Sequence, residues 1–73
     1  MKLRAWMSAN DVKAHDFSVR MAAQLRRNYF SQKTVENWVQ GRTIPQREFM
    51  NAISEITGGA VTPNDFFSMD GAA

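Results

Sequence analysis

The chain has 73 residues, no cysteine and a formal net charge of +2. A chain this short forms one domain that buries only about 60% of its unfolded surface, so a compact helical bundle or a homodimer is expected. Disulfides and thiolate metal sites are excluded. No apolar run approaches the roughly 20 residues that span a bilayer, and Lys2, Arg4 and Ser8 interrupt the apolar run that a signal peptide needs. A soluble, cytoplasmic protein is predicted.

The charges are sorted along the chain. All nine basic side chains lie within residues 1–47 together with three acids, whereas residues 48–73 hold four acids and no base. This asymmetry indicates an N-terminal part that faces a polyanion and an acidic C-terminal part. An ordinary solvated surface is the alternative.

The first two predicted elements are helices. The first covers residues 2–9 and ends at Asn10 and Asp11. One stripe of this helix is apolar: Leu3, Trp6 and Met7. The second covers residues 15–27 and ends at Asn28, which tolerates a left-handed backbone. Its apolar side chains follow at steps of four: Phe17, Met21 and Leu25.

A third helix is predicted over about Gln32–Gln40. Ser31 is a favourable N-cap, and Gly41 is favourable directly after the last turn. Three apolar residues share one stripe of this helix, which we expect to be buried: Val35, Trp38 and Val39.

The rest of the chain predicts a fourth helix and a short fifth one. The fourth begins at or just after Pro45, runs to about Thr57 and stops at Gly58. Its apolar stripe consists of Phe49, Ala52, Ile53 and Ile56. Thr62 caps the fifth helix, with Pro63 in its first position and Asp65 close to a capping box. We expect three apolar residues to fold back onto the core: Phe66, Phe67 and Met69. The predicted fold is an all-α compact bundle of four to five short helices.

The third helix carries a polar face opposite its apolar stripe. This face consists of Gln32, Lys33, Glu36, Asn37 and Gln40. Amide side chains match the N6/N7 edge of adenine, and lysine matches O6/N7 of guanine. A merely solvated face is usually rich in Lys/Glu pairs, whereas this one is rich in amides. The face therefore favours reading of a major groove, with solvation as the alternative.

The stretch "SQKTVENWVQGRTIP" resembles the recognition helix and following loop of the Cro and phage-repressor helix-turn-helix family (XRE type). The likeness includes Val35, Trp38 and the Gly41-Arg42-Thr43 turn. The closing "ITGGAVTPNDFF" resembles the end of small Cro-like regulators of phages and bacteria. With the first helix, the resemblance covers most of the chain.

The resemblance implies a sequence-specific double-stranded DNA-binding transcriptional regulator, a Cro-like repressor of a phage or bacterium. Three residues match positions that reach base edges: Gln32, Lys33 and Asn37. Four match positions that hold phosphates without reading sequence: Ser31, Gln40, Arg42 and Thr43. We expect Glu36 to pair with Lys33 or Gln40, with a contact to cytosine N4 as the alternative.

The chain departs from the family pattern in two places. Ala14 and His15 occupy the start of the second helix, where the family often has a phosphate-binding glutamine. The spacing from Phe17 to Val35 is also longer than usual, so either the second helix or the turn is extended. In the extension we expect three phosphate donors: Arg26, Arg27 and Tyr29. The alternative is that they cap the second helix and stay in water.

No catalytic constellation, cofactor motif or metal-ligand set is present in the sequence, so an enzyme is not expected. The rival interpretation is a protein-interaction module, such as an antitoxin or excision factor, that acts through its C-terminal segment. For the DNA-binding reading we expect a homodimer, including one that assembles only on DNA. Its predicted interface consists of Phe66, Phe67 and Met69.

Overall fold

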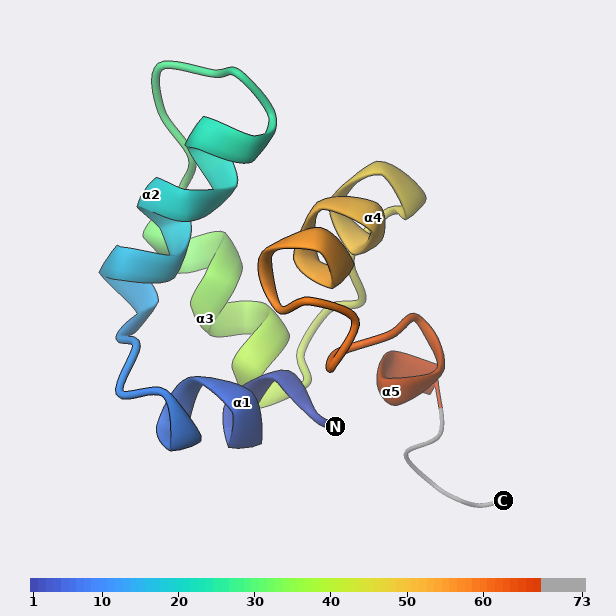
Figure 1. The fold of residues 1–73 in the computed structure, drawn as a ribbon. Helices are drawn as coiled ribbons and strands as arrows, with labels where there is room; N and C mark the ends of the chain where they lie inside the picture. The colour runs from blue at the N-terminus through green and yellow to red at the C-terminus, as the bar shows by residue number, and fades with distance from the viewer. Residues whose placement is uncertain (68–73) are drawn as a thin grey trace.

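The computed structural model describes residues 1–67, which form five helices and contain no strand. The helices are α1 (Leu3–Ala9), α2 (Ala14–Gln24), α3 (Gln32–Gln40), α4 (Arg47–Ile56) and α5 (Asn64–Phe67) (Figure 1). The prediction of an all-α bundle of four to five short helices is confirmed. Met69 lies outside the described residues.

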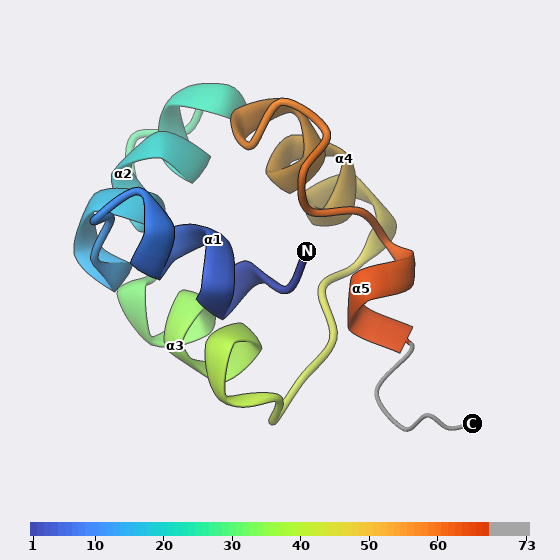
Figure 2. The same cartoon turned by 60° about the horizontal axis from the view of Figure 1, so that its bottom comes forward.

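α2 lies at the centre of the packing, since it contacts both α3 and α4, and α1 packs against α3. With the bottom of the molecule turned toward the viewer, the helices form a ring that brings the N-terminus next to α5 (Figure 2). The α-amino group of Met1 donates to the Ala60 carbonyl at 2.9 Å, and Lys2 Nζ donates to the Asp65 carbonyl at 3.0 Å. The two ends of the described chain are therefore joined.

The core is built from the predicted stripes. The largest fully buried side chains come from α2, α3, α4 and the segment before α5: Phe17, Met21, Val35, Ile53 and Val61. Leu3, Trp6 and Met7 on α1 are also buried, whereas Leu25, Val39, Phe49 and Ile56 are partly buried against the same cluster. Phe66 is buried as expected, and the side chain of Phe67 lies outside the description.

An aromatic cluster of Phe30, Trp38 and Phe49 joins the turn, α3 and α4. The ring centroid of Phe30 lies 5.6 Å from that of Trp38 and 5.3 Å from that of Phe49. The centroids of Trp38 and Phe49 are 5.8 Å apart. Such spacings fall in the favourable range for aromatic pairs. Trp38, which sequence places on the apolar stripe, is thus a core residue.

Four helices end in the same backbone motif. At or directly after the C-cap of each helix stands a residue with a positive φ: Asp11 (55°), Arg26 (59°), Gly41 (78°) and Gly58 (66°). In α2, the Arg27 N–H donates to the Ala22 carbonyl at 2.8 Å and the Arg26 N–H to the Ala23 carbonyl at 3.2 Å. These are the two hydrogen bonds of a Schellman motif, which satisfy carbonyls that the helix leaves free.

The end of α2 corrects the sequence prediction. α2 stops at Gln24, not near Arg27, and the left-handed residue is Arg26 rather than Asn28. Arg26 and Arg27 therefore follow the helix instead of forming its last turn. Because residues 25–31 connect α2 to α3, the residues that the resemblance counts as an extension lie in the turn and do not lengthen the helix. The sequence left these two possibilities open.

Arg26→Gly is expected to stabilise the fold by about 1 kcal/mol. A left-handed backbone costs a residue with a Cβ atom about 1–2 kcal/mol, and the entropy of glycine in the unfolded chain offsets part of the gain. The melting temperature should rise by about 4–8 °C. Arg26→Ala is the control, because it shortens the side chain but keeps Cβ, and it should show no gain. An equal gain in both variants would contradict the backbone explanation.

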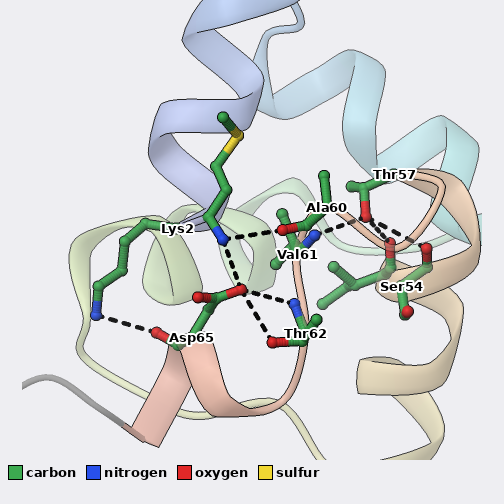
Figure 3. A network of polar contacts seen from close by, with 9 residues as sticks. Lys2, Ser54, Thr57, Ala60, Val61, Thr62 and Asp65 are labelled. Carbon is green, nitrogen blue, oxygen red and sulfur yellow. Dashed lines mark hydrogen bonds and ion pairs between the residues drawn. The ribbon is translucent and has the colours of Figure 1, made fainter.

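Polar contacts fix the segment between α4 and α5 (Figure 3). The buried Thr57 hydroxyl donates to the Ile53 carbonyl at 2.9 Å and accepts from the Val61 N–H at 3.1 Å. Asp65 Oδ2 accepts from the Thr62 N–H at 2.8 Å, which confirms the expected capping contact, and also from the α-amino group at 2.9 Å. Asp65 thus connects the start of α5 with the N-terminus.

The surroundings of Asp65 predict a loss of stability in acid. Burial alone would raise the pKa of the Asp65 carboxyl, but hydrogen bonds from Thr62 and the α-amino group, with the positive charge of that group, hold the pKa below its ordinary 3.8. A carboxyl with a lowered pKa stabilises the fold above its ordinary pKa, and this contribution is lost as pH falls through the lowered value.

Asp65→Asn should therefore melt below the wild type at neutral pH, and the difference should close at pH values below 3.8. Asp11→Asn is the matched control, since its carboxylate is 92% exposed and its ion-pair partner Lys13 lies 4.0 Å away. This control should follow the wild type throughout. A gap between Asp65→Asn and the wild type that is independent of pH would exclude the charge as its cause.

Candidate nucleic-acid interface

α3 is held rigidly at its first turn. The Ser31 side chain accepts a hydrogen bond from the Thr34 N–H at 3.3 Å, which confirms Ser31 as the N-cap. Phe30 and Val35, both buried, occupy the two positions of a hydrophobic staple, which fixes the angle at which the chain enters a helix. The start of α3 is therefore oriented by the core, although its outer face is free.

The polar face of α3 turns away from the core. Gln32, Lys33 and Gln40 are exposed, and Asn37 and Glu36 are partly buried. Gln32 Nε2 donates to Glu36 Oε2 at 2.9 Å, so Glu36 pairs with Gln32 and not with the expected Lys33 or Gln40. One N–H and the side-chain carbonyl of Gln32 remain available, because a glutamine amide has two donor hydrogens and an acceptor oxygen.

The residues after α3 also face solvent. Gly41 adopts the left-handed conformation that ends the helix, as the sequence predicted, and the Arg42 N–H donates to the Asn37 carbonyl at 2.9 Å. Arg42 and Thr43 are exposed. Of the predicted phosphate-binding residues at this end, Gln40, Arg42 and Thr43 thus lie consecutively around one exposed corner with Gly41.

The two arginines of the turn have different surroundings. Arg27 Nη2 lies 3.6 Å from Glu48 Oε2, and its guanidinium carbon lies 5.3 Å from the centre of the Phe49 ring. Arg27 therefore fastens the turn to the start of α4, a partnership that the sequence interpretation did not foresee. Arg26 is exposed, and Tyr29 is 74% exposed. The phosphate role predicted for the turn can thus be filled by Arg26 and Tyr29 without breaking a contact.

The unpaired cations lie mainly in the N-terminal two thirds of the fold. Among residues 1–67, seven basic side chains have no ion pair: Lys2, Arg4, Arg20, Arg26, Lys33, Arg42 and Arg47. In contrast, two acids of α4 already have partners. Glu48 forms an ion pair with Arg27 of the turn, and Glu55 accepts a hydrogen bond from Gln24 at the end of α2. Of the cations without an ion pair, Lys33 lies on the polar face of α3 and Arg42 follows the helix directly after Gly41.

Three grooves border α3. One, of about 330 Å³, lies between α1, the end of α3 and α5, and includes Arg4, Thr43 and Asp65. A second lies between α1 and Val39 and includes Asp11. The third, of about 210 Å³, lies between α2, the turn and Gln32, and includes His15 and Tyr29. His15 and Tyr29, far apart in sequence, are thus brought to one groove.

The described residues offer neither a metal site nor a membrane span. Within residues 1–67, no three His, Cys, Asp or Glu side chains are grouped so that they could hold a metal ion. No helix among these residues has the length and apolar character needed to cross a bilayer.

Comparison with known proteins returned no matching family model, no matching curated protein and no matching solved structure.

Proposed function

We propose that this chain is a sequence-specific double-stranded DNA-binding protein, a Cro-like transcriptional repressor that acts in the cytoplasm of a bacterial cell. The observation that carries the proposal is the outer face of α3, where two exposed glutamines, a lysine and an asparagine stand on a helix fixed by its N-cap. A helix with side chains is about 10–12 Å across, and the major groove is about 12 Å wide.

The proposed roles follow from position. At the start and middle of α3, Gln32, Lys33 and Asn37 read base edges, since amides and lysine carry the donors and acceptors that distinguish base pairs. The helix ends contact phosphates, which set the register of the protein on the duplex. The residues assigned to phosphates are Ser31, Gln40, Arg42 and Thr43. The Ser31 hydroxyl can still donate a hydrogen bond while its oxygen accepts from Thr34.

The experiment that tests the proposal is selection of binding sites from random duplexes, followed by affinity measurements over a range of salt concentrations. A DNA-binding protein should enrich one sequence, and its affinity should fall steeply with salt because bound phosphates release counterions. A flat salt dependence without enrichment would contradict the proposal and favour a protein-interaction module. Lys33→Glu, at an exposed position of α3, is the control that should lose enrichment while keeping the fold.

We expect two copies on a pseudo-palindromic site with half-sites about one helical turn apart, because one recognition helix covers too few base pairs to select a site in a genome. Phe66, one of the expected interface residues, is buried within its own protomer and is therefore already part of the core. The mass of the complex and its footprint measure the stoichiometry. One copy per duplex with a single protected half-site would contradict the dimer.

A further inference from the structure

The groove between α2 and the enlarged turn has an apolar floor and a polar rim. Its floor is formed by Val19, Ala22 and Phe30, and Val19 is 54% exposed. Its rim carries His15 from α2, Asn28 and Tyr29 from the turn, and Gln32 from α3. Three of its lining residues, Asn28, Tyr29 and Phe30, come from the turn, which arches beyond the end of α2 (Figure 1).

The rim is composed of hydrogen-bond donors. Imidazole, amide and phenol groups each can donate to an anion. Within residues 1–67, the side chains of His15, Asn28 and Tyr29 make no hydrogen bond, and no carboxylate lines the groove. The two grooves at the other end of α3 include Asp65 or Asp11. Those two grooves also carry basic side chains, Lys2 and Arg4 in the first and Arg4 and Lys13 in the second. No Lys or Arg lines the groove at the turn, so an anion bound there would be held by hydrogen-bond donors.

The groove adjoins the exposed face of α3. Gln32 belongs both to the rim and to the proposed base-reading residues. A strand whose bases meet the start of α3 must pass the groove with its backbone. One nucleotide of that backbone presents an apolar deoxyribose beside a charged phosphate, a combination that matches an apolar floor beside uncharged donors.

We propose that this groove seats one deoxyribose–phosphate unit of the DNA strand that runs beside the start of α3. The sugar lies against Val19, and the phosphate accepts hydrogen bonds from Asn28, Tyr29 and His15. This inference rests on the proposed function, since it assumes a duplex in contact with α3. It gives the enlarged turn a direct role in affinity and none in the choice of sequence.

The sharpest test compares two isosteric substitutions that add the same charge. Asn28→Asp places a carboxylate on the rim, whereas Asn51→Asp places one at an exposed position of α4, in a groove that no α3 residue lines. Asn28→Asp should bind the selected duplex and a random duplex at least tenfold more weakly, with the base preference unchanged. Asn51→Asp should remain within twofold of the wild type.

Tyr29→Phe provides a second variant that leaves folding intact, because it removes one hydroxyl from a side chain that is 74% exposed. It should weaken binding to every sequence by at least threefold. Equal affinities for Asn28→Asp and Asn51→Asp, or a changed base preference in Asn28→Asp, would overturn the groove assignment while the proposed function stands. A wild-type protein without salt-dependent binding to duplex DNA would overturn both.

Discussion

Trp38→Ala is expected to abolish the cooperative thermal transition and not to weaken DNA binding selectively. The Trp38 side chain is 5% exposed and packs against Phe30 and Phe49. Truncation of a buried aromatic costs about 3–5 kcal/mol. Small domains have little stability to lose, since folded proteins in general are stable by only about 5–15 kcal/mol. Circular dichroism during heating measures the transition directly.

Lys33→Ala is the control for this experiment, because it truncates an exposed residue of the same helix. It should retain the transition and lose affinity for DNA. If Trp38→Ala instead melted normally and lost only DNA binding, the two faces of α3 would have been assigned the wrong way round. A melt of Trp38→Ala with reduced cooperativity but retained helical signal would still agree with a core role, since packing is lost before the helices are.

The helices themselves could be predicted from the sequence, because the capping residues and the spacing of the apolar residues indicate the same segments. On α3, Ser31, the stripe of Val35 and Trp38, and Gly41 each indicate the same boundaries, and the structure has those boundaries. On α2 the local signals were misleading. Asn28 is the better left-handed residue by propensity, but Arg26 takes that position, and Phe30 is drawn into the core a few residues later.

Side-chain partners across the fold could not be predicted, since they depend on which helices meet. Arg27 contacts Glu48 and Phe49 only because the turn packs on the start of α4. The groove that brings His15 beside Tyr29 depends on the path of the same turn. One signal was present but unused: Phe30 directly precedes the N-cap Ser31, the position from which an apolar residue staples a helix start.

The division between base reading and positioning predicts different losses for Gln32→Ala and Arg42→Ala. Gln32→Ala should flatten the preference at one or two base pairs, which corresponds to about 1–3 kcal/mol of discrimination. Arg42→Ala should weaken binding to all sequences about equally and reduce the salt slope by roughly one. Both residues are exposed, so neither change should alter the melting temperature. Repeating the site selection with each variant measures the preference.

The hydrogen bond from Gln32 to Glu36 complicates the first variant, because its loss leaves a carboxylate without its partner beside the DNA. The double variant Gln32→Ala/Glu36→Gln separates the two effects. If the freed charge of Glu36 caused the loss, the double variant would recover both affinity and preference. If Gln32 reads a base, the double variant should recover affinity on all sequences but keep the flattened preference. Identical sequence profiles for Gln32→Ala and Arg42→Ala would contradict the division of roles along α3.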